Sequence, residues 1–292
     1  MEFWAKNLSS PEGPVLTKSN DILLVEMGED AGCISIVDHN NRKKKQLVKT
    51  GRPNGLAIDS EGNIWVAESK TPSLLKINTE GKVTTVMQEC AGTPLLFPND
   101  LIFDADGLLY MTDSGILHTD FVHNGSIRPD YKNAEYNGKV FQINTKTNES
   151  YLIDDGLLFA NGIAIGPKGH LYVNETITGN IYQYEKSNGQ YNRQKRSLFA
   201  NVLLDDGLVY YRGPDGMKFG ESGKLYCTVY GQGDVTVLDL EGNVVERIKT
   251  LGKCPTNLVF GPKDSHLLFI TEVSNGVLEC HRVNENGFPL LS

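Results

Sequence analysis

One sequence pattern recurs six times along this chain of 292 residues. Each copy consists of a small turn, an apolar run, a polar turn and a second apolar run. The polar turns, such as DSEGN at residues 59–63, carry the Asp, Ser and Gly that tight hairpins prefer. Repeats at this period are typical of solenoids and propellers, so they constrain the fold more than any single motif does. The copies occupy residues 11–27, 53–69, 98–114, 160–176, 214–230 and 255–273.

Two further strands complete each repeat. A third run follows every copy and alternates apolar and polar residues, as a half-buried strand does. A shorter fourth strand follows in five of the six repeats, and residues 2–14 resemble the missing one. The sequence therefore predicts an all-β, six-bladed β-propeller with four antiparallel strands per blade, in which the N-terminal strand closes the last blade. We expect residues 1–292 to form one domain. Two β-sandwiches, the alternative, would leave six matched copies unexplained.

The charge balance argues against nucleic-acid binding. The net charge is −8 and the pI is near 5.3, whereas a nucleic-acid groove needs a basic stripe. One basic run, at residues 42–45, lies between two strand-like segments and is interpreted as a solvated turn. The protein is therefore not expected to bind nucleic acid.

Targeting signals and disulfide patterns are not visible. The chain begins acidic and no apolar segment follows, so we expect no secretion signal. No run of about 18 apolar residues occurs, so neither a transmembrane helix nor a membrane partner is expected. The five cysteines are odd in number and lack metal-binding spacing, which predicts reduced thiols in the cytoplasm. They are Cys33, Cys90, Cys227, Cys254 and Cys280.

Each repeat begins its first strand with a side chain that carries oxygen. In a propeller these strands line the central channel, so the six side chains converge on one axis. Asn and Asp favour turns for local reasons, which suffices for any one position. That reason does not cover Glu12, whereas a hard cation with oxygen ligands explains the whole set. The positions are Glu12, Asn54, Asn99, Asn161, Asp215 and Asn257, with Thr256 as the alternative to Asn257.

The predicted ion is Ca²⁺, which takes about 6–8 oxygen ligands. Two carboxylates and two carboxamides, with water completing the shell, would neutralise a doubly charged ion. Without an ion, the carboxylates would repel each other and lose solvation. No His or Cys occupies these positions, which disfavours zinc and copper. Mg²⁺, Mn²⁺ and the disfavoured Zn²⁺ are the other divalent cations considered.

The longest gap between repeats lies in the third one. The extra residues, 114–139, directly follow Asp113, which ends the strand beside the one that Asn99 begins. These two ends are adjacent in an antiparallel pair, so Asp113 is expected near the same mouth as Asn99. Long excursions from a regular scaffold often act as lids, and a decorated surface loop is the alternative. Acidic residues at roughly matching strand ends are Glu26, Glu68, Glu175 and Glu272.

Four motifs in order resemble the regucalcin–gluconolactonase family of six-bladed propellers. They are PEGP at 11–14, FPNDLIFDADGLLYMTDSG at 97–115, FANGIAIGPKGHLYVNET at 159–176 and GPDGMKFGESGKLYCTVYGQG at 213–233. Each is weak alone, but the resemblance extends over essentially the whole chain. It implies lactone hydrolysis, with related members acting on phosphotriester-type compounds. It also implies metal ligation by Glu12, Asn161 and Asp215, with Asn99 binding directly or through water, and a catalytic role for Asp113.

The sequence departs from this family at one position. Sugar-lactone members often carry Arg two residues before the asparagine that matches Asn99, whereas this chain has Phe97 there. Together with the aromatic residues of the insertion, this substitution favours a less polar lactone. The predicted substrate-contacting residues are Asn99, Phe97, His118, Phe121 and Tyr136.

The resulting hypothesis is a metal-dependent lactonase. The cation would act as a Lewis acid on the lactone carbonyl, and Asp113 would activate water as a general base. A non-catalytic, metal-containing propeller that binds a partner is the alternative from a different class. A phosphotriester-type hydrolase or a lyase on the same site is another. The expected partner is a small lactone, and the protein is expected to be a monomer or a weak homo-oligomer.

Overall fold

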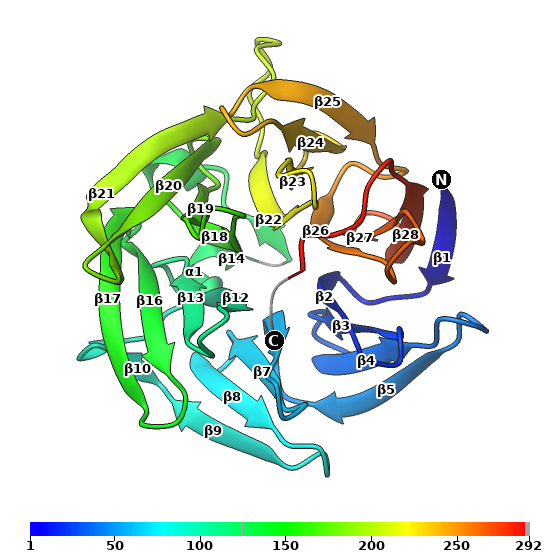
Figure 1. Cartoon of the computed structure of the whole chain (residues 1–292), viewed down its shortest axis with the longest axis horizontal. Coiled ribbons are helices and arrows are strands. Elements are labelled where there is room, and N and C mark those ends of the chain that lie inside the picture. Colours follow the sequence, from blue (N-terminus) through cyan, green and yellow to red (C-terminus); the bar gives the residue numbers. More distant parts are fainter. Residues whose placement is uncertain (124, 290–292) are drawn as a thin grey trace.

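Six four-stranded antiparallel sheets surround a central axis in the computed structural model, which describes residues 1–123 and 125–289 (Figure 1). The predicted six-bladed β-propeller is therefore confirmed. Blade 1 contains β2 (Pro11–Leu16), β3 (Ile22–Glu26), β4 (Cys33–Val37) and β5 (Lys44–Lys49). Blade 2 contains β6 (Pro53–Ile58), β7 (Ile64–Glu68), β8 (Ser73–Ile77) and β9 (Val83–Met87). Blade 3 contains β12 (Pro98–Phe103), β13 (Leu109–Asp113), β16 (Gly138–Asn144) and β17 (Glu149–Leu157).

The other three blades follow the same plan. Blade 4 contains β18 (Ala160–Ile165), β19 (Leu171–Glu175), β20 (Asn180–Ser187) and β21 (Gln190–Asn201). Blade 5 contains β22 (Gly213–Phe219), β23 (Leu225–Tyr230), β24 (Asp234–Leu238) and β25 (Val244–Lys249). Blade 6 contains β26 (Pro255–Phe260), β27 (Leu267–Glu272), β28 (Val277–Arg282) and β1 (Glu2–Lys6).

The ring closes through the pairing of the two ends of the chain. β1 is antiparallel to β28, with Glu2 opposite Cys280 and Lys6 opposite Val277. The predicted closure of the last blade by the N-terminal strand is therefore confirmed. Because β1 completes the sheet of blade 6, unfolding of either end exposes an unpaired strand edge.

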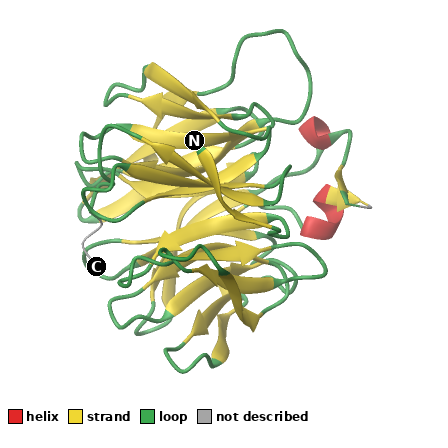
Figure 2. Ribbon diagram, turned by 90° about the vertical axis from the view of Figure 1, so that its right-hand side faces the viewer, coloured by secondary structure: helices red, strands yellow, loops and turns green. Residues whose placement is uncertain are grey.

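Short elements lie outside the blades. β10 (Glu89–Cys90) and β11 (Thr93–Pro94) form a small hairpin before blade 3. The insertion between β13 and β16 contains α1 (His118–Phe121), β14 (Val122–His123), β15 (Ser126–Ile127) and the 3₁₀ turn η1 (Tyr131–Asn133). The side view shows the helical segments on one face of the ring (Figure 2).

Apolar side chains fill the spaces between neighbouring blades. Trp65 and Leu74 of blade 2, for example, pack with Met111 and Phe141 of blade 3. All four are nearly inaccessible to solvent, and full burial of a large apolar side chain contributes roughly 1.5–3 kcal/mol. The hydrophobic core is therefore a ring of clusters around a polar axis.

The first strands of neighbouring blades approach closely at the axis, and small residues permit this. A Cβ atom on Gly55 would lie 2.6 Å from the carbonyl oxygen of Asn99 in the next blade. Such an approach requires a residue without a side chain. Gly13, Gly162 and Gly216 occupy the same position in blades 1, 4 and 5, whereas blades 3 and 6 carry Asp100 and Asn257 there.

Hydroxyl groups connect the backbones of successive blades around the axis. Thr112 Oγ1 donates to the carbonyl oxygen of Asn161 at 2.6 Å, and Thr228 Oγ1 donates to that of Thr256 at 2.7 Å. Thr256 Oγ1 in turn donates to the carbonyl oxygen of Pro11 at 2.8 Å, which joins blade 6 to blade 1. These bonds give carbonyl oxygens of one blade a donor from the next blade and hold the inner strands in register.

Two sequence-based expectations concern the environment of the protein. All five cysteines are unpaired, as the scattered spacing predicted. Within residues 1–123 and 125–289, no helix has the length and apolar character needed to cross a membrane. A cytoplasmic location and a monomeric or weakly associating state stay predictions.

The hydroxyl bridges predict a specific stability effect. Thr112→Val keeps the side-chain shape but leaves the carbonyl oxygen of Asn161 without this donor. We expect the free energy of unfolding, measured by urea denaturation, to fall by about 1–3 kcal/mol. Thr84→Val on the exposed face of β9 is the matched control, with an expected change within about 0.5 kcal/mol. Equal unfolding midpoints for both variants would contradict the role of the bridges.

Candidate active site

A cavity of about 710 Å³ opens at one mouth of the ring, and all six blades contribute to its floor. The polar positions predicted from the repeats line it together, including the four predicted metal ligands. In the sixth repeat, the sequence left Asn257 and Thr256 as alternatives for this position. Thr256 lines the cavity, whereas Asn257 packs against Gly216. The floor residues are Glu12, Asn54, Asn99, Asn161, Asp215 and Thr256.

The amide groups of Asn99 and Asn161 are oriented by neighbouring hydroxyls. Asn99 Nδ2 donates to Ser114 Oγ at 3.0 Å, and Asn161 Nδ2 donates to Thr176 Oγ1 at 3.0 Å. Each hydroxyl then donates to a carbonyl oxygen of the next blade. Because the amide nitrogens are occupied in this way, the Oδ1 atoms are the ones available as ligands to a group in the cavity.

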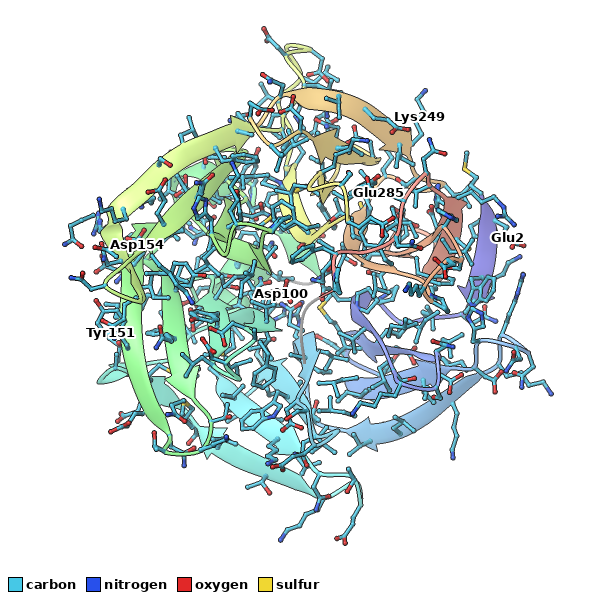
Figure 3. All side chains as sticks on the ribbon, viewed as in Figure 1. Glu2, Asp100, Tyr151, Asp154, Lys249 and Glu285 are labelled. Carbon is cyan, nitrogen blue, oxygen red and sulfur yellow. The ribbon has the colours of Figure 1, made fainter. Side chains whose placement is uncertain are left out.

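Three carboxylates, those of Glu12, Asp100 and Asp215, interact electrostatically at the axis. Burial raises the pKa of Glu12 well above its usual value, and the charges of Asp215 and Asp100 raise it further. Burial and then the charge of Asp100 also raise the pKa of Asp215, although the Asn161 amide opposes this shift. Figure 3 shows Asp100 near the centre of the ring. Sequence reasoning assigned no role to Asp100. The available signal was its replacement of the glycine found here in four other repeats.

The donor set fits a hard divalent cation. In the described residues, His, Cys, Asp and Glu side chains alone form no group of three or more that could hold a metal ion. A site here therefore depends on the asparagine amides as well as on Glu12 and Asp215. Glu12 Oε2 is buried without a hydrogen-bond partner in the described part of the chain. An unpartnered buried carboxylate oxygen is costly unless a cation or water binds it, and oxygen ligands of this kind suit Ca²⁺ or Mg²⁺.

Asp113 lies one layer behind the cavity. Its carboxylate accepts hydrogen bonds from the backbone N–H groups of Leu96 at 2.8 Å, Phe97 at 3.2 Å and Gly115 at 2.8 Å. Burial raises the pKa of Asp113, and these three N–H groups oppose the rise. Asp113 is not one of the described residues that line the cavity. The contacts give Asp113 a positioning role for the loop before Asn99, so its role as general base stays a prediction.

The same arrangement recurs in other blades. The acidic residue that ends the second strand accepts backbone N–H groups from the loop that leads into the first strand of its own blade. The bonds run from Ser9 to Glu26 at 2.9 Å, from Arg52 to Glu68 at 2.6 Å, from Leu158 to Glu175 at 2.8 Å and from Cys254 to Glu272 at 3.0 Å. We call this group of residues the acidic clamps, and Asp113 is the clamp of blade 3.

The insertion forms one wall of the cavity. His118 and Phe121 of α1 line it, as do Val122, His123 and Ile127. The Phe121 ring packs 4.6 Å from that of Phe159 and 5.7 Å from that of Tyr211. The segment therefore contributes to the pocket instead of being only a surface decoration. Whether it opens and closes as a lid stays a prediction.

The predicted substrate-contacting residues are divided by the structure. Asn99, Phe97, His118 and Phe121 line the cavity. Tyr136 lies behind them, with its ring 6.0 Å from that of Phe159 and its hydroxyl donating to the carbonyl oxygen of Tyr131. Tyr136 is not among the described residues that line the cavity, so its side chain supports the wall from behind.

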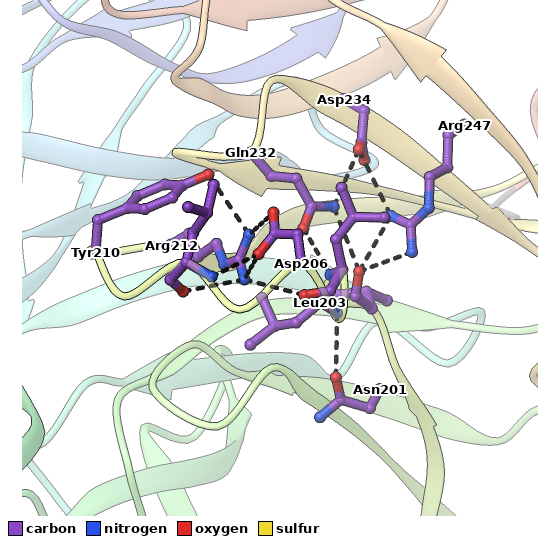
Figure 4. Close-up of polar contacts among 11 residues, drawn as sticks. Asn201, Leu203, Asp206, Tyr210, Arg212, Gln232, Asp234 and Arg247 are labelled. Atoms are coloured by element: carbon purple, nitrogen blue, oxygen red, sulfur yellow. Dashed lines mark hydrogen bonds and ion pairs between the residues drawn. The ribbon is translucent and has the colours of Figure 1, made fainter.

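A second wall comes from the loop of residues 202–212, which the sequence did not single out. Tyr211 lines the cavity and packs against Tyr131 and Tyr230. The loop is held by the next residue, Arg212, whose guanidinium makes two 2.7 Å bonds to the carboxylate of Asp206 (Figure 4). A charged fork of this type fixes a loop in one geometry. Phe159 and Arg52 are two further lining residues that the sequence did not predict.

A family model described as "SMP-30/Gluconolactonase/LRE-like region" matches residues 10–274 of this chain. The chain belongs to this family. A gluconolactonase of Zymomonas mobilis is 28% identical over 299 residues, which covers 95% of this chain and 80% of that protein. The family resemblance predicted from the four motifs is therefore confirmed.

Solved structures with the same fold include proteins named gluconolactonase and regucalcin. A gluconolactonase from Xanthomonas campestris has a TM-score of 0.78 at 22% identity, over 98% of this chain and 88% of that one. A calcium-binding protein, regucalcin, from Agrobacterium tumefaciens has a TM-score of 0.78 at 18% identity, over 98% and 94% of the two chains. At this identity the similarity establishes the shared propeller fold.

The clamp geometry of Asp113 predicts a loss of stability on amide substitution. Asp113→Asn would turn an amide group toward N–H donors, so we expect the free energy of unfolding to fall by about 1–3 kcal/mol in urea denaturation. Glu272→Gln, in the clamp of blade 6, is the matched variant and should lose a similar amount. An unchanged stability for Asp113→Asn beside a destabilised Glu272→Gln would contradict the clamp role in blade 3.

The raised pKa values predict how pH changes the stability of the metal-free protein. Above the ordinary Glu value of 4.5, Glu12 retains its proton in the folded state but not in the unfolded state. The folded state then binds more protons, so its stability falls as pH rises through this window. We expect Glu12→Gln to flatten this fall when urea midpoints are measured in chelator from pH 5 to 8. Added Ca²⁺ should stabilise the wild type more at pH 8 than at pH 5, because protons compete with it. Parallel pH profiles for both proteins would rule out Glu12 as the source.

Proposed function

We propose that this protein is a metal-dependent lactonase that acts on a small-molecule lactone. The observation that carries this proposal is the oxygen-rich floor of the cavity, where buried carboxylates and oriented amides meet beneath aromatic walls. Membership of a family named in part for gluconolactonase, and the gluconolactonase from Zymomonas mobilis, support lactone chemistry. The calcium-binding regucalcin of the same fold supports Ca²⁺ as the ion.

Glu12, Asn99, Asn161 and Asp215 would hold the cation. When bound, a divalent cation supplies Lewis-acid polarisation of the lactone carbonyl oxygen. Ca²⁺ is the proposed ion, and Mg²⁺ and Mn²⁺ accept similar oxygen ligands. The hydroxyls of Ser114 and Thr176 would keep the two amide oxygens directed at the site, so that little reorganisation accompanies binding.

The walls of the cavity would bind the ring of the substrate and exclude water. Phe97, Phe121 and Phe159 present apolar surface above the floor. His118 stands beside them, and burial, followed by the charge of Arg52, lowers the pKa of His118 to about 4. Its imidazole is therefore neutral at physiological pH and offers one donor and one acceptor.

Proton transfer has two candidate carboxylates. The sequence-based assignment is Asp113, which the clamp contacts tie to backbone N–H groups. Asp215 lines the cavity, so its carboxylate faces the space in which a lactone and a water molecule would meet. We therefore propose that Asp215 is the better placed base, with Asp113 acting through the loop that positions Asn99.

Lactone hydrolysis releases acid, so a pH-stat assay tests this proposal. We expect turnover of a panel of sugar, aliphatic and aromatic γ- and δ-lactones in Ca²⁺ and its loss in chelator. Asp215→Asn should lower kcat by at least about 100-fold, because it removes a ligand or base. Asp113→Asn should keep a larger share of kcat if its role is positioning.

The same assay separates the other functions. Turnover of a phosphotriester but of no lactone would favour the phosphotriester-type hydrolase, and elimination products would favour a lyase. Tight Ca²⁺ binding by calorimetry without turnover of any substrate class would favour a partner-binding propeller. A fall in kcat for Asp113→Asn as large as that for Asp215→Asn would instead support Asp113 as the general base.

A further inference from the structure

Arg52 brings a cationic group to the wall of the cavity. It follows β5 and directly precedes β6, two residues before Asn54 of the floor. Ser69 fixes it from the neighbouring strand end. Ser69 Oγ donates to the carbonyl oxygen of Arg52 at 2.8 Å, and it accepts a hydrogen bond from Arg52 Nη1 at 2.9 Å. The backbone N–H of Arg52 donates to Glu68 of the acidic clamp. The side chain is therefore held in place without a ligand.

The guanidinium of Arg52 has donors to spare. Among the described residues, the guanidinium makes one side-chain hydrogen bond, to Ser69. No carboxylate of these residues lies within ion-pair distance of it. A guanidinium has five N–H donors. Burial lowers the pKa of Arg52 to about 10, and the charges of Glu68 and Glu12 oppose this shift, so the group stays charged at neutral pH. A half-buried charge without a close counter-ion is well suited to an anionic ligand.

Phe97 supports this guanidinium from one side. The Arg52 Cζ atom lies 5.2 Å from the centre of the Phe97 ring, within the range of a cation–π contact. The ring is itself held edge-on by His118 at 5.6 Å and by Phe159 at 5.7 Å. Phe97 therefore serves as a platform that orients the fork of Arg52, while the neutral His118 adds a polar group beside it.

The charges around the cavity favour one anionic group at this wall. The axis holds three carboxylates, Glu12, Asp100 and Asp215, so a doubly charged ion bound there would leave little attraction for an anion. At the rim, the exposed Glu29 also lines the cavity and opposes an anion, but water and salt screen it. The other titratable side chains that line the walls are His118, His123, Tyr211 and Tyr230. Arg52 is thus the fixed positive charge available to a substrate, and its planar fork matches a carboxylate in a bidentate pair.

We propose that Arg52, backed by Phe97, is an anion subsite and that the substrate is a lactone carrying an ionised carboxylate. This inference rests on the proposed lactonase function. It also revises the less polar substrate suggested by Phe97 alone. An arginine does line the cavity, but in blade 2. Arg52 stands two residues before Asn54, just as Phe97 stands two residues before Asn99 in blade 3.

A binding experiment tests the subsite without turnover. Tetrahydrofuran-2-carboxylate and its neutral carboxamide share a ring that cannot be hydrolysed, and calorimetry in Ca²⁺ gives both dissociation constants. We expect the carboxylate to bind the wild type about 10- to 100-fold more tightly, the range of a charge-assisted hydrogen bond. Arg52→Gln should abolish this preference, and Lys70→Gln, which removes an exposed charge from the same blade, should keep it.

A conservative variant, Arg52→Lys, keeps the subsite testable in the same binding experiment. Arg52→Lys keeps the charge without the fork, so an intermediate loss is expected even if Arg52→Gln does not fold, as judged by thermal unfolding. A carboxylate preference unchanged in Arg52→Lys and Arg52→Gln would overturn the subsite. Equal binding of the two probes by the wild type would do the same.

Hydrolysis of matched γ-lactones, one with a carboxylate and one with a carboxamide, completes the test. Carboxylate-selective binding without turnover of any lactone would support the subsite and reject the lactonase. Turnover of both lactones at equal kcat/KM, unaltered in Arg52→Gln, would support the lactonase and reject the subsite. If Arg52→Gln lowers kcat/KM for a neutral polyhydroxylated lactone as much as for the carboxylate lactone, Arg52 recognises hydroxyls and the carboxylate assignment is wrong.

Discussion

The close approach of six inner strands around one axis is the constraint on which the rest of the structure depends. Backbone meets backbone there, as where Gly55 faces the carbonyl oxygen of Asn99, and hydroxyls such as that of Thr112 complete the contact. The residue before each tight position then lines the channel, because its neighbours already fill the space between blades. A ring of oxygen atoms is therefore a direct consequence of closing the propeller with Asn, Asp, Glu and Thr at these positions.

This ring has an electrostatic cost that the fold must offset. Glu12, Asp100 and Asp215 lie close enough for the charges of the others to raise the pKa of Glu12. The folded protein therefore retains protons or binds a cation at the axis, and the apolar clusters between blades stabilise it against the residual repulsion. Local conflict within an otherwise consistent fold is typical of functional sites. Here the conflict is strongest where the donor set best fits a cation.

The sequence predicted what repeats and missed what does not. Six copies, a missing strand and turn chemistry sufficed for the blades, the closure through β1 and the floor residues, because these depend on local patterns. The location of Asp113 at the mouth followed from antiparallel pairing, but the direction of its carboxylate did not, since that depends on the N–H groups of Leu96 and Phe97. Tyr211 could not be predicted because its loop reaches the cavity only through the arrangement of blades 4 and 5 in space.

Floor and walls are thus under different constraints. A change on the floor disturbs the packing of neighbouring blades, whereas loops at the mouth vary with little effect on the ring. The positions two residues before Asn54 and Asn99 illustrate this. This chain has Arg52 in blade 2 and Phe97 in blade 3, whereas the family resemblance implies an arginine in blade 3, roughly 60° away about the axis of a six-fold ring. If Arg52 binds an anion as proposed, the charged end of a bound molecule would point toward blade 2 while the floor keeps its oxygen set. Substrate choice can therefore change within such a propeller without any change to the groups that would perform the reaction.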